Sequence, residues 1–235
     1  VDFTAEVERS LRVLDGAVVV FDGKAGVEPQ SETVWRQADK YRVPRVCFVN
    51  KLNLIGGDFY MSLESIRERL NKNAAPIMLP IGTEENLKGW VDLVTLKAWE
   101  YEDESGMGVK ETAVPEDMKE KVARYREELI DMVVESDEAL VEKYLEDGVL
   151  DEEELREAIR KSTVEGRFFP VIGGDGRKVV AKIILDAVLD YLPSPIDLPP
   201  VTGINPKTGQ EEERKADDYE KFSALACKIA SDPYV

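Results

Sequence analysis

The sequence predicts an α/β protein built on a parallel-type sheet, with a mixed α+β insertion in its middle. Three continuous apolar runs of strand length carry this prediction: AVVVFD (17–22), RVCFVN (45–50) and RFFPVIGG (167–174). Runs of this kind are typical of strands buried on both faces of a parallel sheet. Strand, helix and strand follow one another through residues 17–50, which predicts a right-handed βαβ unit.

The helices are predicted from apolar residues that recur at spacings of three and four. In the sheet-forming parts, these patterns cover residues 4–14, 30–42, 58–71 and 178–191.

The pattern changes at about residue 74. APIMLPIG and WVDLVTLKAWEYED are typical of short strands in a separate, antiparallel unit. Three acidic amphipathic helices are expected next, at 115–135, 137–146 and 151–165. The parallel-sheet pattern returns only with RFFPVIGG, so the insertion spans about ninety residues.

Two further expectations concern the C-terminal part. PSPIDLPPVTG (193–203) is rich in proline and predicts an extended, stiff linker. FSALACKIASDPYV predicts the opening strand of a new β domain.

Cys47 and Cys227 both lie in apolar runs, which favours small core residues over a disulfide or a nucleophile.

Composition excludes several classes of function. With 48 acidic and 31 basic residues the formal charge is −17, which argues against binding free nucleic acid or an anionic membrane. The chain has no histidine, so imidazole bases and imidazole metal ligands are ruled out. No apolar run approaches the roughly 18 residues that span a bilayer, and no secretory signal is found. These features predict a cytoplasmic protein, or one from an organellar matrix.

Several stretches closely resemble translation elongation factor G, a ribosomal translocase of the translational GTPase family. They are VDFTAEVERSLRVLDGAVVVFD, GVEPQSETVWRQADKY, VPRVCFVNK, FFPV, LDAVLDYLPSP and FSALACKIASDP. The resemblance implies a P-loop GTPase G domain that is truncated, because this sequence begins inside the turn that family members place before VDFT. It further implies the following organisation: 1–71, first part of the G domain; 72–166, inserted subdomain; 167–192, last strand and helix of the G domain; 193–215, linker; 216–235, start of a second, β-barrel domain.

The resemblance also implies a guanine site. Family members bind GTP or GDP with magnesium, and they read the base with an Asn-Lys-x-Asp turn and a second turn after a later strand. Here Asn50 and Lys51 open the first turn, and Asp175 and Gly176 lie in the second. Both turns follow strands at the carboxyl end of the sheet, where open α/β sheets bind ligands. Lys51 is expected to stack along the base, and Asn50 to tie neighbouring loops together.

The fourth position of the turn departs from the family, because Asn53 stands where an aspartate is expected. Aspartate offers two acceptors to the N1–H and N2–H₂ donors of guanine, whereas an asparagine offers one acceptor and one donor. One donor of guanine would then face the amide donor of Asn53, at a cost of about 1–3 kcal/mol. Xanthine carries a carbonyl at that position, so Asn53 favours xanthine. The alternative is that Asn53 caps a turn in a site that binds nothing.

Two other departures weaken nucleotide chemistry. No G-x-x-x-x-G-K-[ST] occurs in the 235 residues, and FDGKAG (21–26) has the wrong spacing for a phosphate loop. The magnesium-binding threonine and the catalytic histidine of the family are also missing. The Ser-Ala backbone expected near guanine O6 is replaced by Asp175-Gly176, which brings an acidic side chain close to that carbonyl.

Beside an altered-specificity nucleotide binder that favours xanthine through Asn53, two functions remain open at this point. The first is a fragment of a translational GTPase that acts in ribosomal translocation, with degenerate base recognition and little GTP hydrolysis of its own. Its implied partners are the ribosome and a ribosomal stalk protein. The second is a non-catalytic binding or scaffold module derived from such a factor, which binds no nucleotide. No catalytic or metal-ligating residue is assigned, and self-association is expected through the strand Ala17–Asp22 if it forms an exposed sheet edge.

Overall fold

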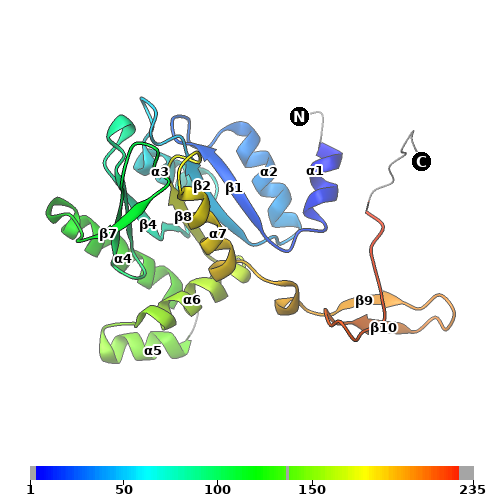
Figure 1. Ribbon diagram of the computed structural model, residues 1–235. Coiled ribbons are helices and arrows are strands. Elements are labelled where there is room, and N and C mark those ends of the chain that lie inside the picture. The colour runs from blue at the N-terminus through cyan, green and yellow to red at the C-terminus, as the bar shows by residue number, and fades with distance from the viewer. Residues whose placement is uncertain (1–3, 136–137, 228–235) are drawn as a thin grey trace.

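The computed structural model describes residues 4–135 and 138–227. Within them, a parallel sheet has the strand order β1-β2-β8-β3 (Figure 1). Its strands are β1 (Ala17–Asp22), β2 (Arg45–Asn50), β8 (Phe169–Gly173) and β3 (Ala74–Pro76). The predicted α/β class is therefore confirmed.

Helices cover this sheet, and residues at their first turns determine where they begin. Asp58 caps α3 (Phe59–Arg69) by accepting the backbone N–H groups of Tyr60 and Met61. Pro29 opens α2 (Pro29–Lys40), where its fixed φ suits the first helical position. The remaining helices of this part are α1 (Thr4–Leu11), which packs on α2, and α7 (Val180–Tyr191), which packs on β2.

A second sheet is antiparallel and has the order β4-β5-β6-β7. Its strands are β4 (Met78–Ile81), β5 (Gly89–Asp92), β6 (Ala98–Tyr101) and β7 (Val109–Thr112). The three acidic helices follow as α4 (Lys119–Val134), α5 (Glu138–Asp147) and α6 (Glu152–Val164). Short 3₁₀ turns lie at Glu84–Asn86, Glu116–Met118 and Pro195–Asp197.

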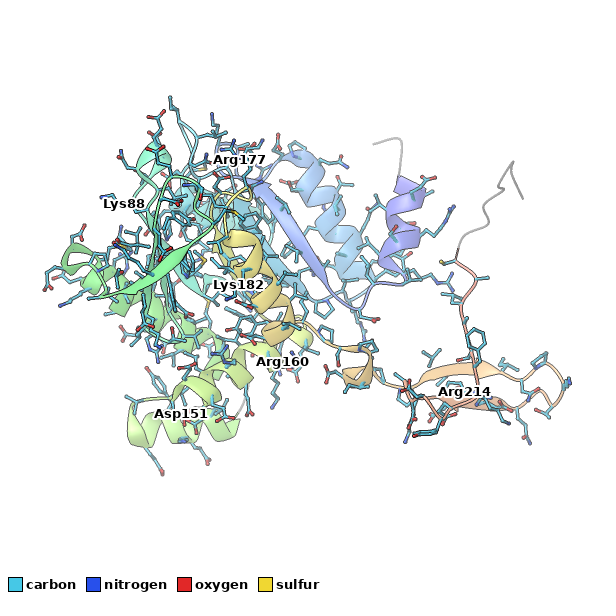
Figure 2. The ribbon with its side chains drawn as sticks, in the orientation of Figure 1. Lys88, Asp151, Arg160, Arg177, Lys182 and Arg214 are labelled. Atoms are coloured by element: carbon cyan, nitrogen blue, oxygen red, sulfur yellow. The ribbon has the colours of Figure 1, made fainter. Side chains whose placement is uncertain are left out.

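Both sheets share one hydrophobic core. Leu79 and Val91 of the antiparallel sheet, Leu129 of α4 and Ile172 of β8 are all fully buried in the same cluster. Arg160 of α6 further secures α7, because its guanidinium donates to the Leu189 and Asp190 carbonyls at the end of that helix. Figure 2 shows Arg160 at this end of α7.

Two expectations about the strands need correction. APIMLPIG does not lie wholly in the antiparallel unit, since Ala74–Pro76 pairs with Phe169–Val171 and only Met78–Ile81 joins the second sheet. A single residue therefore separates the strand of one sheet from the strand of the other. In addition, β1 is not buried on both faces, since Val20 is 58% exposed, and among the described strands β1 pairs only with β2.

The C-terminal part also differs from expectation. Residues 201–214 do not form an extended linker but a hairpin of β9 (Val201–Ile204) and β10 (Glu211–Arg214). Asn205 stabilises its loop by accepting the N–H groups of Lys207 and Thr208, and Gly209 supplies a positive φ of 71°. The hairpin projects away from both sheets (Figure 1).

No strand forms in residues 221–227, and Cys227 is exposed instead of buried. The rest of the predicted strand, 228–235, lies outside the described residues. Among the described helices, none combines the length and the apolar character needed to cross a membrane.

Candidate functional site

The carboxyl ends of β1, β2 and β8 meet at one edge of the parallel sheet. Asp22 ends β1, Asn50 ends β2 and the turn of residues 173–176 follows β8. The strand register aligns Asp22 with Asn50, and Val49 with Gly173. Polar side chains from three distant segments are thereby collected on one edge, which is where open α/β sheets bind ligands.

Asn50 joins the two turns that the sequence singled out. Its side-chain oxygen accepts the backbone N–H of Lys51 at 2.8 Å and that of Gly176 at 3.0 Å. Two backbone bonds flank this contact, from Gly174 to Val49 at 2.9 Å and from Leu52 to Gly174 at 3.2 Å. The turns after β2 and β8 are therefore held as one unit.

Lys51 has a left-handed backbone conformation, with φ of 64°. Its ammonium group lies 2.6 Å from a carboxylate oxygen of Asp22, whose other oxygen accepts the N–H of Lys24 at 2.9 Å. The bond from Lys51 is the main cause that lowers the pKa of Asp22. The Lys51 side chain is half-exposed, so its stem borders the surface at this edge.

Gly23 has a structural role in the run FDGKAG, whose spacing does not match a phosphate loop. Its backbone N–H donates to the Asn50 carbonyl at 2.8 Å. A side chain at this position would bring its Cβ to 2.8 Å from that oxygen and 2.9 Å from Leu52. The glycine thus permits the close approach of the loop after β1 to the turn after β2.

Asn53 is partly buried, and its side-chain amide makes no hydrogen bond with any residue in the described ranges. The turn around it is closed by the backbone, because the Leu54 N–H donates to the Lys51 carbonyl at 3.1 Å. The amide is therefore not used as a turn cap and keeps its donor and its acceptor for other groups.

Asp175 is only 4% exposed, and its carboxylate is turned toward its own loop. It accepts the backbone N–H of Arg177 at 3.1 Å, as well as Nε and a terminal nitrogen of the same guanidinium at 3.2 and 3.3 Å. Figure 2 shows Arg177 at this end of the sheet. The negative charge expected beside the base is thus balanced by an exposed arginine.

The same turn contacts the antiparallel sheet. The Val179 N–H donates to the Gly106 carbonyl at 2.9 Å, and the Lys178 ammonium lies 4.5 Å from the centre of the Tyr101 ring. These contacts connect the turn after β8 to the loop between β6 and β7.

The structure thus brings Asn50, Lys51, Asp175 and Gly176 together, with Asn53 in the same turn. Sequence reasoning missed Asp22 and Arg177 as members of the site. Asp22 could have been predicted from its position at the end of a strand. The pairing of Asp175 with Arg177 could have been suggested only by their spacing of two residues. In the described part of the chain, no group of three or more histidine, cysteine or acidic residues is arranged to hold a metal ion.

Comparisons with known proteins agree with this architecture. Residues 1–194 match the family described as the elongation factor Tu GTP binding domain. A crystal structure from Thermus thermophilus is similar to this chain, with a TM-score of 0.74 and 33% sequence identity. The match covers 88% of this chain and 32% of that one, so the chain spans about a third of the length of this relative.

Proposed function

Because the chain belongs to the elongation factor Tu GTP-binding-domain family, we propose that it is the base-reading part of a translational GTPase of the elongation factor G type, acting in ribosomal translocation. The bond between Asn50 and Gly176 carries this proposal, since it unites the two turns that would enclose a purine. The expected location is the cytoplasm or an organellar matrix, where ribosomes work.

In this proposal Lys51 borders one face of the base, and Asn53 faces its Watson–Crick edge. The amide of Asn53 has no partner in the described chain, so both its donor and its acceptor are open to a base. Xanthine satisfies both groups through its N1–H and its C2 carbonyl, whereas guanine leaves one donor against another. The site is therefore proposed to prefer xanthine nucleotides over guanine nucleotides.

Asp175 and Gly176 take a supporting role. The Gly176 N–H is already bonded to Asn50, and the Asp175 carboxylate is bonded to Arg177. The Gly176 N–H is therefore not free to donate to the O6 of a purine, and the Asp175 carboxylate can only accept, which predicts weak binding overall. Since the 235 residues contain no G-x-x-x-x-G-K-[ST], we expect the chain itself to hydrolyse GTP little or not at all.

The deciding experiment is equilibrium binding of labelled GDP and XDP to the 235-residue chain, with and without magnesium, alongside Asn53→Asp. The unmodified chain should bind XDP at least about tenfold more tightly than GDP, and Asn53→Asp should reverse the order. Equal affinities for both nucleotides in both proteins would contradict the assignment of Asn53. Absence of binding in every case would overturn the nucleotide proposal and favour the scaffold function.

A protein-binding function of the inserted unit is the second candidate, and an exposed apolar surface favours it. Leu96 is 46% exposed and Val149 is 68% exposed, and both line a hollow of about 560 Å³ beside α4. We propose that this surface contacts a ribosomal stalk protein. Val149→Asp should abolish binding to purified ribosomes, whereas Ile204→Asp on the projecting hairpin should not.

A further inference from the structure

A cavity of about 230 Å³ lies between α7 and the antiparallel sheet, away from the turns that follow β2 and β8. Its aromatic wall consists of Trp90, Trp99 and Tyr191. Apolar side chains from the β3–β4 segment, β7 and α7 line the remainder, and Lys182, labelled in Figure 2, contributes to the lining from the first turn of α7. The space is small for a drug-sized ligand but large enough for a single ring with a short chain.

Polar groups in this wall have hydrogen-bonding capacity that the described chain does not use. Tyr191 is 4% exposed and Trp90 is 8% exposed, yet neither the hydroxyl nor the indole N–H makes a hydrogen bond with a described residue. One oxygen of Asp92 accepts the N–H groups of Val94 and Thr95, at 2.7 and 3.1 Å, and the Thr95 side chain also bonds to this carboxylate; its second oxygen accepts no backbone N–H of those described. Among the described residues, neither the Tyr191 hydroxyl nor the Trp90 indole nitrogen is fully buried without a partner, so both are accessible from the cavity and available to an occupant.

The charges around the cavity favour a cation. Arg156 forms ion pairs with Asp190 and Glu152, and its charge and that of Arg126 also act on Asp92. The lining that remains holds two carboxylates, Asp92 and Asp186, against the ammonium of Lys182; Lys182 and Asp186 are both exposed, so Asp92 is the one partly buried charge among the three. Burial raises the pKa of Asp92, so a positive charge placed beside its second oxygen would relieve an unfavourable desolvation.

The aromatic wall favours the same kind of ligand. The faces of indole and phenol rings attract cations, and their edges and faces also pack well against a second ring. Trp90 and Trp99 lie opposite each other in the pairing of β5 with β6, so both indoles come from neighbouring strands of one sheet.

We propose that this cavity binds a small organic cation with an apolar ring and one ammonium group, the ring against Trp90 and Trp99 and the ammonium at Asp92. Tyr191 contributes a hydroxyl to the cavity wall from the last residue of α7. The inference does not depend on nucleotide binding, because none of the residues proposed to hold the base (Asn50, Lys51, Asn53, Asp175 and Gly176) lines the cavity.

Calorimetric titration of the full chain with three matched probes tests the proposal: 2-phenylethylamine, 2-phenylethanol and 3-phenylpropionate. They share a ring and a two-carbon spacer and differ in charge. The amine should bind at least tenfold more tightly than the alcohol, and the carboxylate should bind most weakly. Equal binding of all three probes, or no binding of any of them, would overturn the proposal before any variant is made.

Variants then locate the site. Asp92→Asn should lower the affinity for the amine at least tenfold and leave the affinity for the alcohol unchanged, whereas Asp103→Asn, a carboxylate outside the cavity, should change neither. Ala187→Leu should abolish binding of both compounds by filling the cavity. If Asp92→Asn fails to fold by near-ultraviolet circular dichroism, Tyr191→Phe replaces it and should weaken amine binding severalfold. An unchanged amine affinity in the folded variants would contradict the assignment.

Discussion

The side-chain oxygen of Asn50 accepts the backbone N–H of Gly176 at 3.0 Å, which joins two turns that lie 126 residues apart in sequence. The same oxygen also accepts the N–H of Lys51. One amide group thus satisfies two backbone donors and holds the ends of β2 and β8 together. Loss of this contact would leave only the backbone bonds from Gly174 to Val49 and from Leu52 to Gly174 between the two turns.

Replacement of Asn50 by alanine should destabilise the chain by about 1–3 kcal/mol, because two backbone donors lose their acceptor. Urea unfolding, followed by tryptophan fluorescence, measures the change in free energy of unfolding. Asn53→Ala is the matched control and should stay within about 0.5 kcal/mol, since the Asn53 amide has no partner among the described residues. Equal losses in the two variants would contradict the structural role of Asn50.

The ion pair between Asp22 and Lys51 should give the stability a pH dependence at low pH. The bond from Lys51 lowers the pKa of Asp22 in the folded chain, so the contribution is complete above the unfolded pKa of about 4. It is lost as the pH falls from there through the lower folded pKa. Lys51→Met should flatten this part of the stability profile by less than about 1 kcal/mol, because both side chains are partly exposed. An unchanged profile would exclude the pair as its source.

Arg45 is 3% exposed, and its guanidinium lies 4.1 Å from the Trp35 ring and 5.0 Å from the Phe169 ring. Its charge is balanced by Asp39. Asp39→Ala should therefore destabilise the chain by about 1.5–3 kcal/mol in chemical unfolding, since it leaves a buried cation without its counter-ion. Glu116→Ala, which breaks the exposed pair with Lys119, should cost less than about 0.5 kcal/mol.

The two cysteines should react very differently with a thiol reagent. Burial raises the pKa of Cys47 to about 12, whereas Cys227 is exposed. At a mildly alkaline pH, Ellman's reagent should modify one thiol per folded chain and both thiols in guanidinium. Cys227→Ser should abolish the fast reaction in the folded state, and a persistent fast reaction would show that Cys47 is accessible.

The free edge of β1 should promote self-association. Val20 is 58% exposed on this strand, and unpaired strand edges with apolar side chains pair readily with other chains. Val20→Lys should shift the chain toward the monomer in sedimentation equilibrium at micromolar concentration. Ile196→Lys, an equally apolar position outside β1, serves as the control and should leave the association unchanged.

Local patterns predicted much of the fold. The helices from α2 to α7 begin and end within a few residues of their predicted bounds, and the three apolar runs became β1, β2 and β8. These features depend on neighbouring residues alone. The placement of Ala74–Pro76 beside Phe169–Val171 could not be read in this way, because it depends on pairing between segments far apart in sequence.

The candidate site was likewise only partly predictable from the sequence. Asn50 and Lys51 are indicated by their motif, and the bond from Gly176 to Asn50 follows from the parallel arrangement of their strands. The contact of Lys51 with Asp22 and the inward turn of Asp175 depend on side-chain rotamers and local charge.

The hairpin at 201–214 was missed for a local reason. The prolines before it suggested an extended chain, whereas Pro195–Asp197 forms a 3₁₀ turn and the hairpin begins at Val201. Asn205 and Gly209 supply the turn that reverses the chain direction, and the two strands then pair.

The bond from Val179 to Gly106, together with Lys178 above Tyr101, connects the turn after β8 to the loop between β6 and β7. A ligand that rearranges this turn would therefore act on the inserted sheet through these two contacts. Binding free energies that are linked in this way are reciprocal. A macromolecule bound to the inserted sheet and a base held at the other end of the contact would each alter the affinity of the other by the same factor.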